Sequence, residues 1–116
     1  MTHPLDRFLD ALEANRRGRA AGVTSLCTAH PVVLRAAVRR AREDGSLVLI
    51  EATSNQVDQF GGYTGMRPAD FVAFAAGLAR EAGFDPRQLL LGADHLGPNP
   101  WHNLPPAEAM AHARPL

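Results

Sequence analysis

The chain has 116 residues, enough for one domain with one modest core, and its 46% of hydrophobic residues is typical of a globular protein. Its formal net charge is zero and its arginines are scattered among acids, which argues against a nucleic-acid-binding surface. No lysine is present, so Schiff-base chemistry on a side-chain amine is excluded for this chain.

Cysteine usage and hydropathy indicate the compartment. A single cysteine, Cys27, has no partner for an internal disulfide, which favours a reducing environment. The amino-terminal segment lacks the apolar run and small-residue cleavage site of a secretory signal. No window approaches the length of an apolar membrane span. We therefore expect a cytoplasmic protein that contacts neither membrane nor nucleic acid.

The first half of the chain alternates helix and strand patterns. Apolar residues at i, i+3, i+4 and i+7 predict an amphipathic first helix, whose buried stripe would be Leu5, Phe8, Leu9 and Leu12. Residues 23–27 form an apolar run of strand length. A second helix is predicted from Pro31 to Asp44, with its buried face at Leu34, Ala37, Val38 and Ala41. The continuous apolar run over 47–50 predicts a strand covered on both faces.

The second half repeats the alternation after a long loop. Glycines and polar residues predict that this loop covers residues 52–67. A third helix is expected to begin at Pro68 and to end before Gly83. The apolar run over 89–91 predicts a third strand, followed by a loop. A fourth helix is expected from Pro105-Pro106, with Met110 on its inner side.

This order, a helix followed by three strand–helix units, predicts an α/β fold with parallel strands and right-handed crossovers. A doubly wound sheet would carry a Gly-rich turn after its first strand, but residues 28–31 read TAHP. A (β/α)8 TIM barrel places polar functional residues at the carboxyl ends of its strands, where His30, Glu51 and Asp94 fall. We therefore expect residues 1–116 to be a single partial barrel domain, incomplete because a whole barrel takes about 250 residues.

Three segments resemble one protein family. The longest is LIEATSNQVDQFGGYTGM at 49–66, and it is flanked in order by CTAHP at 27–31 and LGADHLGPN at 91–99. Together they resemble the GatZ/KbaZ family, the non-catalytic subunits of class II D-tagatose-bisphosphate aldolase, over about residues 5–110. The resemblance implies an aldolase-like (β/α)8 barrel and a role in the catabolism of galactitol, N-acetylgalactosamine or related hexoses.

The resemblance also implies partners, namely a separate catalytic aldolase subunit and a sugar phosphate. Some relatives in the family resemble metal-dependent ketose epimerases. Two features depart from the family pattern. The family barrel continues beyond the point where this chain stops, so we expect the chain to be truncated. Arg67 stands where a capping hydroxyl is usual, which we expect to weaken the start of the third helix by about 1 kcal/mol.

Asp94 and His95 form the clearest candidate pair. In class II aldolases an Asp-His pair at a strand end divides two tasks, so the resemblance implies that Asp94 moves a proton and His95 binds a divalent metal, Zn²⁺, in the full-length parent. Such a metal polarises a ketose carbonyl and stabilises the enediolate. Three protein ligands are the usual minimum, so others would come from strands this chain lacks. Alternatively, Asp94 caps a loop and His95 is a hydrogen-bonded wall residue.

Other polar residues lie at the same predicted end of the sheet. Glu51 ends a buried strand, where an unpaired carboxylate is costly, so it is either an acid/base group or is paired with loop backbone or an arginine. The candidates for binding sugar hydroxyls or phosphate, or for satisfying the loop backbone, are Ser54, Asn55, Gln56 and Gln59. His30 contacts substrate or caps a helix. Cys27 is expected to be a small buried hydrophobe.

Three functional hypotheses remain. The first is a non-catalytic subunit that stabilises a class II tagatose-bisphosphate aldolase, a lyase, and cleaves no sugar alone. The second is part of a metal-dependent ketose epimerase or aldolase of the tagatose or tagaturonate type, inactive alone because this chain has too few ligands. The third is a truncated product without activity, whose open sheet edge and uncovered face favour self-association.

Overall fold

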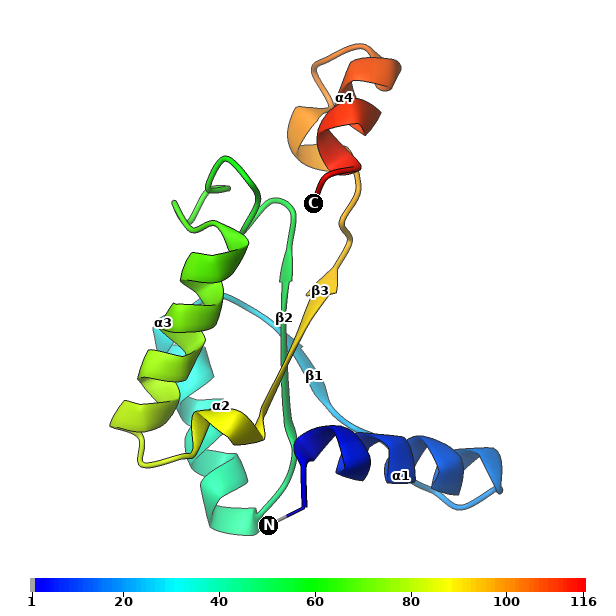
Figure 1. The fold of residues 1–116 in the computed structure, drawn as a ribbon, viewed down its shortest axis with the longest axis vertical. Coiled ribbons are helices and arrows are strands. Elements are labelled where there is room, and N and C mark those ends of the chain that lie inside the picture. The colour runs from blue at the N-terminus through cyan, green and yellow to red at the C-terminus, as the bar shows by residue number, and fades with distance from the viewer. Residues whose placement is uncertain (1) are drawn as a thin grey trace.

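A computed structural model describes residues 2–116 as an open three-stranded sheet with four α-helices (Figure 1). In chain order the elements are α1 (Pro4–Arg16), β1 (Ser25–Cys27), α2 (Pro31–Asp44), β2 (Val48–Thr53), α3 (Pro68–Glu81), β3 (Leu89–Asp94) and α4 (Pro106–Ala113). Short 3-10 turns occupy Pro86–Gln88 and Asn99–Trp101. The strands are parallel in the order β1-β2-β3, which confirms the predicted parallel α/β fold.

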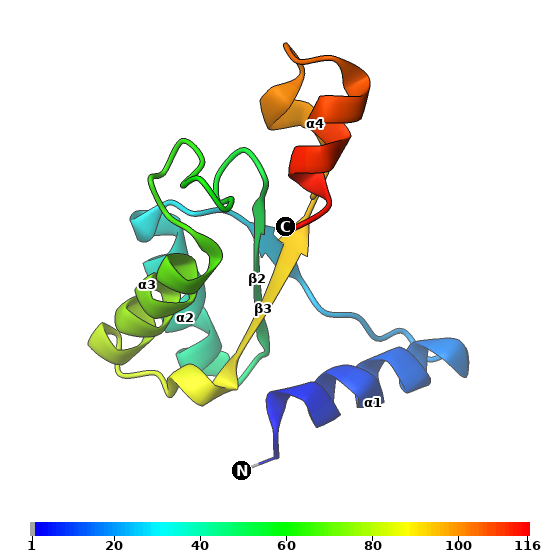
Figure 2. The same ribbon diagram turned by 45° about the horizontal axis from the view of Figure 1, so that its top comes forward.

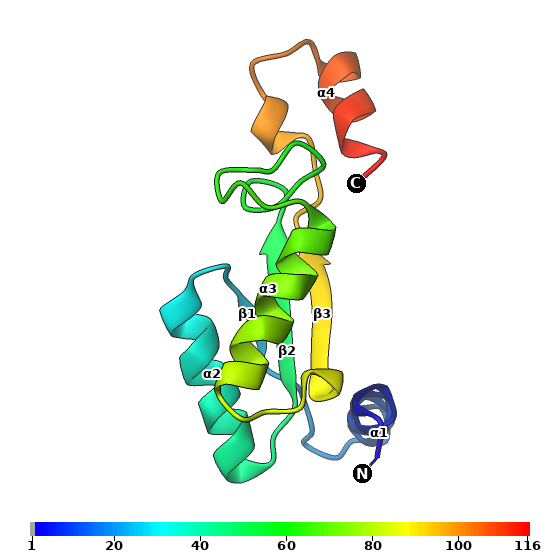
Figure 3. The same ribbon diagram turned by 60° about the vertical axis from the view of Figure 1, so that its left-hand side comes forward.

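Helices cover one face of the sheet. Figures 2 and 3 show α2 and α3 side by side on that face, with α1 apart from them at the amino-terminal end of the strands. In β2 the buried residues alternate with half-buried ones, as expected when only one face is packed. The core joins β2 to α2 and α3, and its members include Leu34, Ala41, Val48, Ile50, Ala52, Phe71 and Leu78.

Local hydrogen bonds define where the helices begin. The ring Nδ1 of His3 accepts from the Leu5 N–H at 3.2 Å, and the ring of His30 accepts from Val32 N–H at 3.3 Å. The start of α3 has an alternative to the missing capping hydroxyl, because the Asp70 carboxylate accepts from the Arg67 N–H at 2.9 Å. The expected weakness of this helix start is therefore partly offset by the acidic residue three positions on.

Strands β2 and β3 each extend three residues beyond the apolar runs that predicted them, to Thr53 and Asp94, whereas β1 begins two residues later, at Ser25. The apolar runs that predicted β2 and β3 stop short of Thr53 and Asp94 because the residues that follow the runs are polar or small. In β2 these residues alternate between buried and half-buried positions. The expectation that the second strand is covered on both faces was wrong, since Leu49 and Glu51 are only half buried. Glu51 is consequently inside a strand.

Two predicted buried faces are exposed instead. Helix α1 forms as expected, but Leu5, Leu9 and Leu12 remain 47%, 52% and 47% exposed. In α4 the buried positions are Ala109 and Ala113, and the expected inner residue, Met110, is 44% exposed. Among residues 2–116, no helix has both the length and the apolar composition needed to cross a membrane.

Candidate functional site

The candidate site lies at the carboxyl ends of the three strands, on the face that α2 and α3 leave open. Parallel pairing aligns Cys27 with Glu51 and Glu51 with Gly92, and it aligns Thr53 with Asp94. Side chains two residues apart on a strand share a face, so Glu51 and Thr53 point the same way, as do Gly92 and Asp94. The two predicted catalytic carboxylates therefore stand on adjacent strands and on the same helix-free face.

Gly92 makes room for the Glu51 side chain. A methyl group added at Gly92 would lie 3.2 Å from Glu51 Cγ and 3.4 Å from its Oε1. The carboxylate thus leans across β3 over the one residue in that row without a side chain. Sequence reasoning did not single out Gly92, although a glycine inside a strand is itself a signal of close approach.

Cys27 stands beside both carboxylates, which corrects its prediction as a buried hydrophobe, because it is exposed. The pKa of its thiol is raised above the usual value by partial burial of the sulfur, then by a hydrogen bond to Asp94, then by the negative charges of Asp94 and Glu51. A raised pKa keeps the thiol protonated at neutral pH, so Cys27 is a poor nucleophile. The sequence signal that could have placed it here is its position at the end of the first predicted strand.

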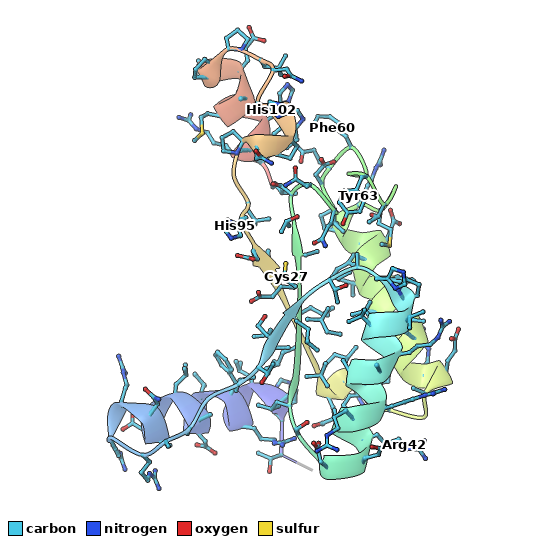
Figure 4. All side chains as sticks on the ribbon, turned by 180° about the vertical axis from the view of Figure 1, so that it is seen from behind. Cys27, Arg42, Phe60, Tyr63, His95 and His102 are labelled. Carbon is cyan, nitrogen blue, oxygen red and sulfur yellow. The ribbon has the colours of Figure 1, made fainter. Side chains whose placement is uncertain are left out.

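His95 follows β3 in a left-handed backbone conformation, with φ of 50°. Its Nε2 lies 3.4 Å from Asp94 Oδ1, and its side chain is 81% exposed (Figure 4). Left-handed backbone is uncommon for residues other than glycine, and it turns the chain sharply after the strand. The turn leaves the imidazole pointing into solvent next to the carboxylate.

The residues of this chain do not by themselves fit a metal centre. A catalytic zinc site takes three protein ligands. Within residues 2–116 no group of three or more His, Cys, Asp or Glu side chains is arranged to hold an ion. His95 and Asp94 supply at most two donors at the end of β3. Metal binding by His95, with further ligands from outside this chain, stays a prediction.

Ser54 ties the loop after β2 to the loop after β3. Its side chain is fully buried, and its hydroxyl lies 3.0 Å from the His95 carbonyl oxygen and 3.2 Å from that of Gly97. This hydroxyl serves the backbone, which is one of the two roles left open by the sequence. By fixing the carbonyl of His95, Ser54 holds the segment that carries the imidazole against the end of β2.

The amides of Asn55 and Gln56 are also used within the loops. Gln56 Oε1 accepts from the Thr53 N–H at 2.8 Å and lies 4.0 Å from the Cys27 sulfur. Asn55 Oδ1 accepts from the Asn99 side-chain amide at 3.1 Å, a second link between the two loops. These contacts favour the loop-building role for both residues, and their contact with a sugar stays a prediction.

Gln59 connects the loop after β2 to α4. Its Nε2 donates to the His112 carbonyl oxygen at 2.7 Å, while its Oε1 is buried without a hydrogen-bond partner among residues 2–116. The rings beside it pack on one another: the Phe60 centroid lies 6.1 Å from that of Trp101 and 5.5 Å from that of His112. These edge-on contacts hold the loop against the carboxyl-terminal segment.

Asp58 organises the turn that follows and was not singled out from the sequence. It is 4% exposed, and its Oδ1 accepts from the N–H groups of Phe60 at 2.7 Å and Gly62 at 3.0 Å. An Asp two residues before an aromatic residue and a Gly pair is the sequence pattern of such a turn.

His30 uses its ring to cap α2 and remains exposed, so its predicted substrate contact stays a prediction.

Comparisons with known proteins agree with the resemblance seen in the motifs. A family model described as D-tagatose-1,6-bisphosphate aldolase subunit GatZ/KbaZ-like matches residues 8–116. The chain is also similar to a solved structure, the crystal structure of a probable tagatose 6 phosphate kinase from Sinorhizobium meliloti 1021, with 55% identity and a TM-score of 0.74. That match covers 79% of this chain and 24% of the other, so this chain spans about a quarter of that relative's length.

Proposed function

The chain belongs to the D-tagatose-1,6-bisphosphate aldolase subunit GatZ/KbaZ-like family, and we propose that it serves a tagatose-bisphosphate aldolase as a non-catalytic, stabilising subunit. The observation that carries this proposal is the family match, which extends over residues 8–116. The family is associated with an aldolase, which is a lyase. The partner in this proposal is a separate catalytic aldolase subunit.

The three strand–helix units form part of a (β/α)8 barrel in this proposal, and residues 1–116 are one partial domain of it. Support comes from the sequential parallel order of β1, β2 and β3 and from the one-sided helix layer. In a barrel wall the helices lie outside and the opposite face lines the interior. That arrangement would turn the side chains of Cys27, Glu51 and Asp94, which share one face near the carboxyl ends of the strands, toward the barrel mouth.

Two features support a role that is not catalytic in the chain alone. The carboxylates of Glu51 and Asp94 stand on an open sheet face, where water is not excluded and electrostatic stabilisation of a transition state is weak. The predicted metal ligand, His95, needs additional ligands from outside residues 2–116. Acid/base roles for Glu51 and Asp94 therefore belong to an assembled site, in which further chain closes the face.

A phosphorylated ketohexose is the substrate class that fits the comparisons. The matching family is described by tagatose bisphosphate, and the 55% identical protein is described as a probable tagatose 6 phosphate kinase. Transfer of a phosphoryl group to tagatose 6-phosphate is therefore the second candidate, because that relative is described as a kinase. A kinase requires a nucleotide donor, which separates the two candidates experimentally.

Light scattering coupled to size-exclusion chromatography tests the proposal. The purified chain is run alone and with a class II tagatose-bisphosphate aldolase catalytic subunit. We expect a single peak that contains both proteins, with a mass equal to that of a complex of fixed stoichiometry. Separate elution of the two proteins, even when both are loaded at high concentration, would contradict the subunit role. ATP-dependent consumption of D-tagatose 6-phosphate by the chain would favour the kinase candidate instead.

A further inference from the structure

An arginine groove lies at the amino-terminal end of the sheet. It opens between the carboxyl-terminal ends of α2 and α3 and encloses about 640 Å³. The basic residues that line it are Arg39 and Arg42 of α2 and Arg80 of α3, and all three are exposed. Glu43 and Glu81 complete its charged lining. Figure 4 shows Arg42 near the end of α2, at the opposite end of the sheet from the candidate site.

The arginine groove carries a surplus of positive charge. Within residues 2–116 none of its three arginines forms an ion pair, whereas Glu81 is paired with Arg35 at 3.3 Å. Glu43 therefore offsets only one of the three. Two of the arginines stand in the last turn of their helices, where each complements roughly half a negative charge from the helix dipole. The groove stays positive after both effects, although the chain as a whole has zero net charge.

One of the three arginines is held in place by the structure itself. Arg42 Nη1 donates to the carbonyl oxygen of Ala82, just after α3, at 3.1 Å. Its guanidinium lies against Gly83, where an added methyl group would come within 3.1 Å of Nη1 and 3.3 Å of Cζ. This contact joins the ends of α2 and α3. A partner that binds the fixed guanidinium therefore loses less conformational entropy than one that must order a free side chain.

The size and the polar groups of the groove favour a peptide segment over a single small anion. A guanidinium pairs with a carboxylate through two parallel N–H···O bonds. The last carbonyl groups of a helix have no partner within the helix, and two helices end at this groove. Such carbonyls repel a bare oxyanion, but they accept from the N–H groups of a peptide backbone. The volume of about 640 Å³ also exceeds what one phosphate or sulfate ion fills.

We propose that the arginine groove is a docking surface for an acidic segment of a partner protein. The carboxylates of that segment pair with Arg39, Arg42 and Arg80, and its backbone N–H groups meet the ends of α2 and α3. Arginine is enriched at protein–protein interfaces, in line with this assignment. The inference rests on the charge of the groove and does not depend on the aldolase role, because the groove and the candidate site lie at opposite ends of the sheet.

Fluorescence anisotropy with a labelled hexaglutamate peptide tests this docking surface on the full chain. We expect saturable binding that weakens as the salt concentration is raised, because the contacts join exposed charges. A labelled hexaglutamine peptide of the same length should not bind. Inorganic phosphate, compared with chloride at equal ionic strength, should not displace the hexaglutamate. An absence of saturable hexaglutamate binding, equal binding of hexaglutamine, or displacement by phosphate would overturn the proposal.

Paired substitutions separate the groove from the overall charge of the chain. Arg39→Gln combined with Arg80→Gln should weaken hexaglutamate binding by about 10-fold, as expected for the loss of two exposed ion pairs. Arg16→Gln combined with Arg19→Gln is the matched control, because it removes the same charge from two exposed arginines outside the groove. The control should keep its affinity within about 2-fold. Circular dichroism establishes that each variant is folded. Equal weakening by the two pairs would show that binding follows net charge alone and would contradict the assignment.

Discussion

The thiol of Cys27, on the edge strand β1, is influenced by two carboxylates, Glu51 on β2 and Asp94 on β3. Partial burial, the hydrogen bond to Asp94 and the charges of Asp94 and Glu51 all raise its pKa. Each of these effects disfavours the negatively charged thiolate. The free energy of unfolding gains nothing from this ionisation at neutral pH, because the thiol is protonated in both states. The raised pKa is instead measurable through the chemical reactivity of the thiol.

Alkylation by iodoacetamide reports on the pKa of Cys27. Because only the thiolate reacts, Cys27 should react more slowly at neutral pH than an unperturbed cysteine, and its rate should rise as the pH passes the raised pKa. Glu51→Gln removes one negative charge, lowers the thiol pKa and should speed alkylation. Glu108→Gln, in α4, is the charge-matched control. A slower reaction of the Glu51→Gln variant would contradict the placement of these groups.

The hydroxyl of Ser54 is the residue-scale link between the two loops. Ser54→Ala leaves the carbonyl oxygens of His95 and Gly97 without this donor in a buried setting, so we expect a loss of about 1–2 kcal/mol in the free energy of unfolding. Ser25→Ala, on exposed β1, should cost much less. Urea denaturation compares them. Equal midpoints for the two variants would show that the link does not stabilise the fold.

At the scale of elements, the loop between β2 and α3 depends on glycines with positive φ. Gly62 and Gly65 share that backbone region, with φ of 55° and 77°, but only Gly62 lies against backbone atoms that a methyl group would overlap. Gly65→Ala should cost about 1–2 kcal/mol for the backbone conformation alone, and Gly62→Ala should cost clearly more. Thermal unfolding of both variants tests this, and the reverse order would refute the loop geometry.

The element order was predictable because helix and strand periodicities are local. Helix α2 agrees with its predicted bounds, Pro31 to Asp44, because proline at its start and glycine after its end are strong local signals. Asp94 was placed at the carboxyl end of β3, where the structure has it, whereas β2 continues past Glu51 to Thr53. Whether polar residues after an apolar run belong to a strand depends on which sheet face the helices cover. That is a tertiary property, invisible to a search for continuous apolar runs.

The candidate site was predictable in position and less so in role. Glu51, Asp94 and His95 were identified because parallel strands bring their carboxyl ends to one edge. Cys27 was misassigned because burial was inferred from residue type alone. The sequence left the loop amides with two roles, since whether Gln56 bonds to its own backbone or to a ligand depends on loop geometry that composition does not encode.

At the scale of the whole molecule, large apolar areas remain uncovered. The leucines of α1 face away from the core, and the sheet has one helix-free face and two unpaired edges. Surfaces of this kind are typical of contacts with another chain. The chain's match to about a quarter of its solved relative agrees with this exposure, because the rest of that relative has no counterpart here.

Self-association of the isolated chain should depend on the α1 stripe. We expect Leu9→Ser, at the most exposed of the three leucines, to lower the weight-average mass measured by sedimentation at a given concentration. Asp10→Ser, one residue further along α1 and also exposed, is the control and should leave the mass unchanged. If the unmodified chain self-associates and Leu9→Ser has the same mass, the α1 stripe is not the contact, and the contact lies on the sheet face or its edges.

We propose that this chain supports a catalytic aldolase subunit without cleaving sugar itself. To test this, the cleavage of D-tagatose 1,6-bisphosphate by a class II catalytic subunit is measured with and without the chain. The remaining cleavage activity is then followed while the catalytic subunit is inactivated by heat. We predict no cleavage by the chain alone, and a higher rate or a longer half-life of the catalytic subunit in its presence. Cleavage by the chain alone, or a catalytic subunit unaffected by saturating amounts of it, would contradict the claim.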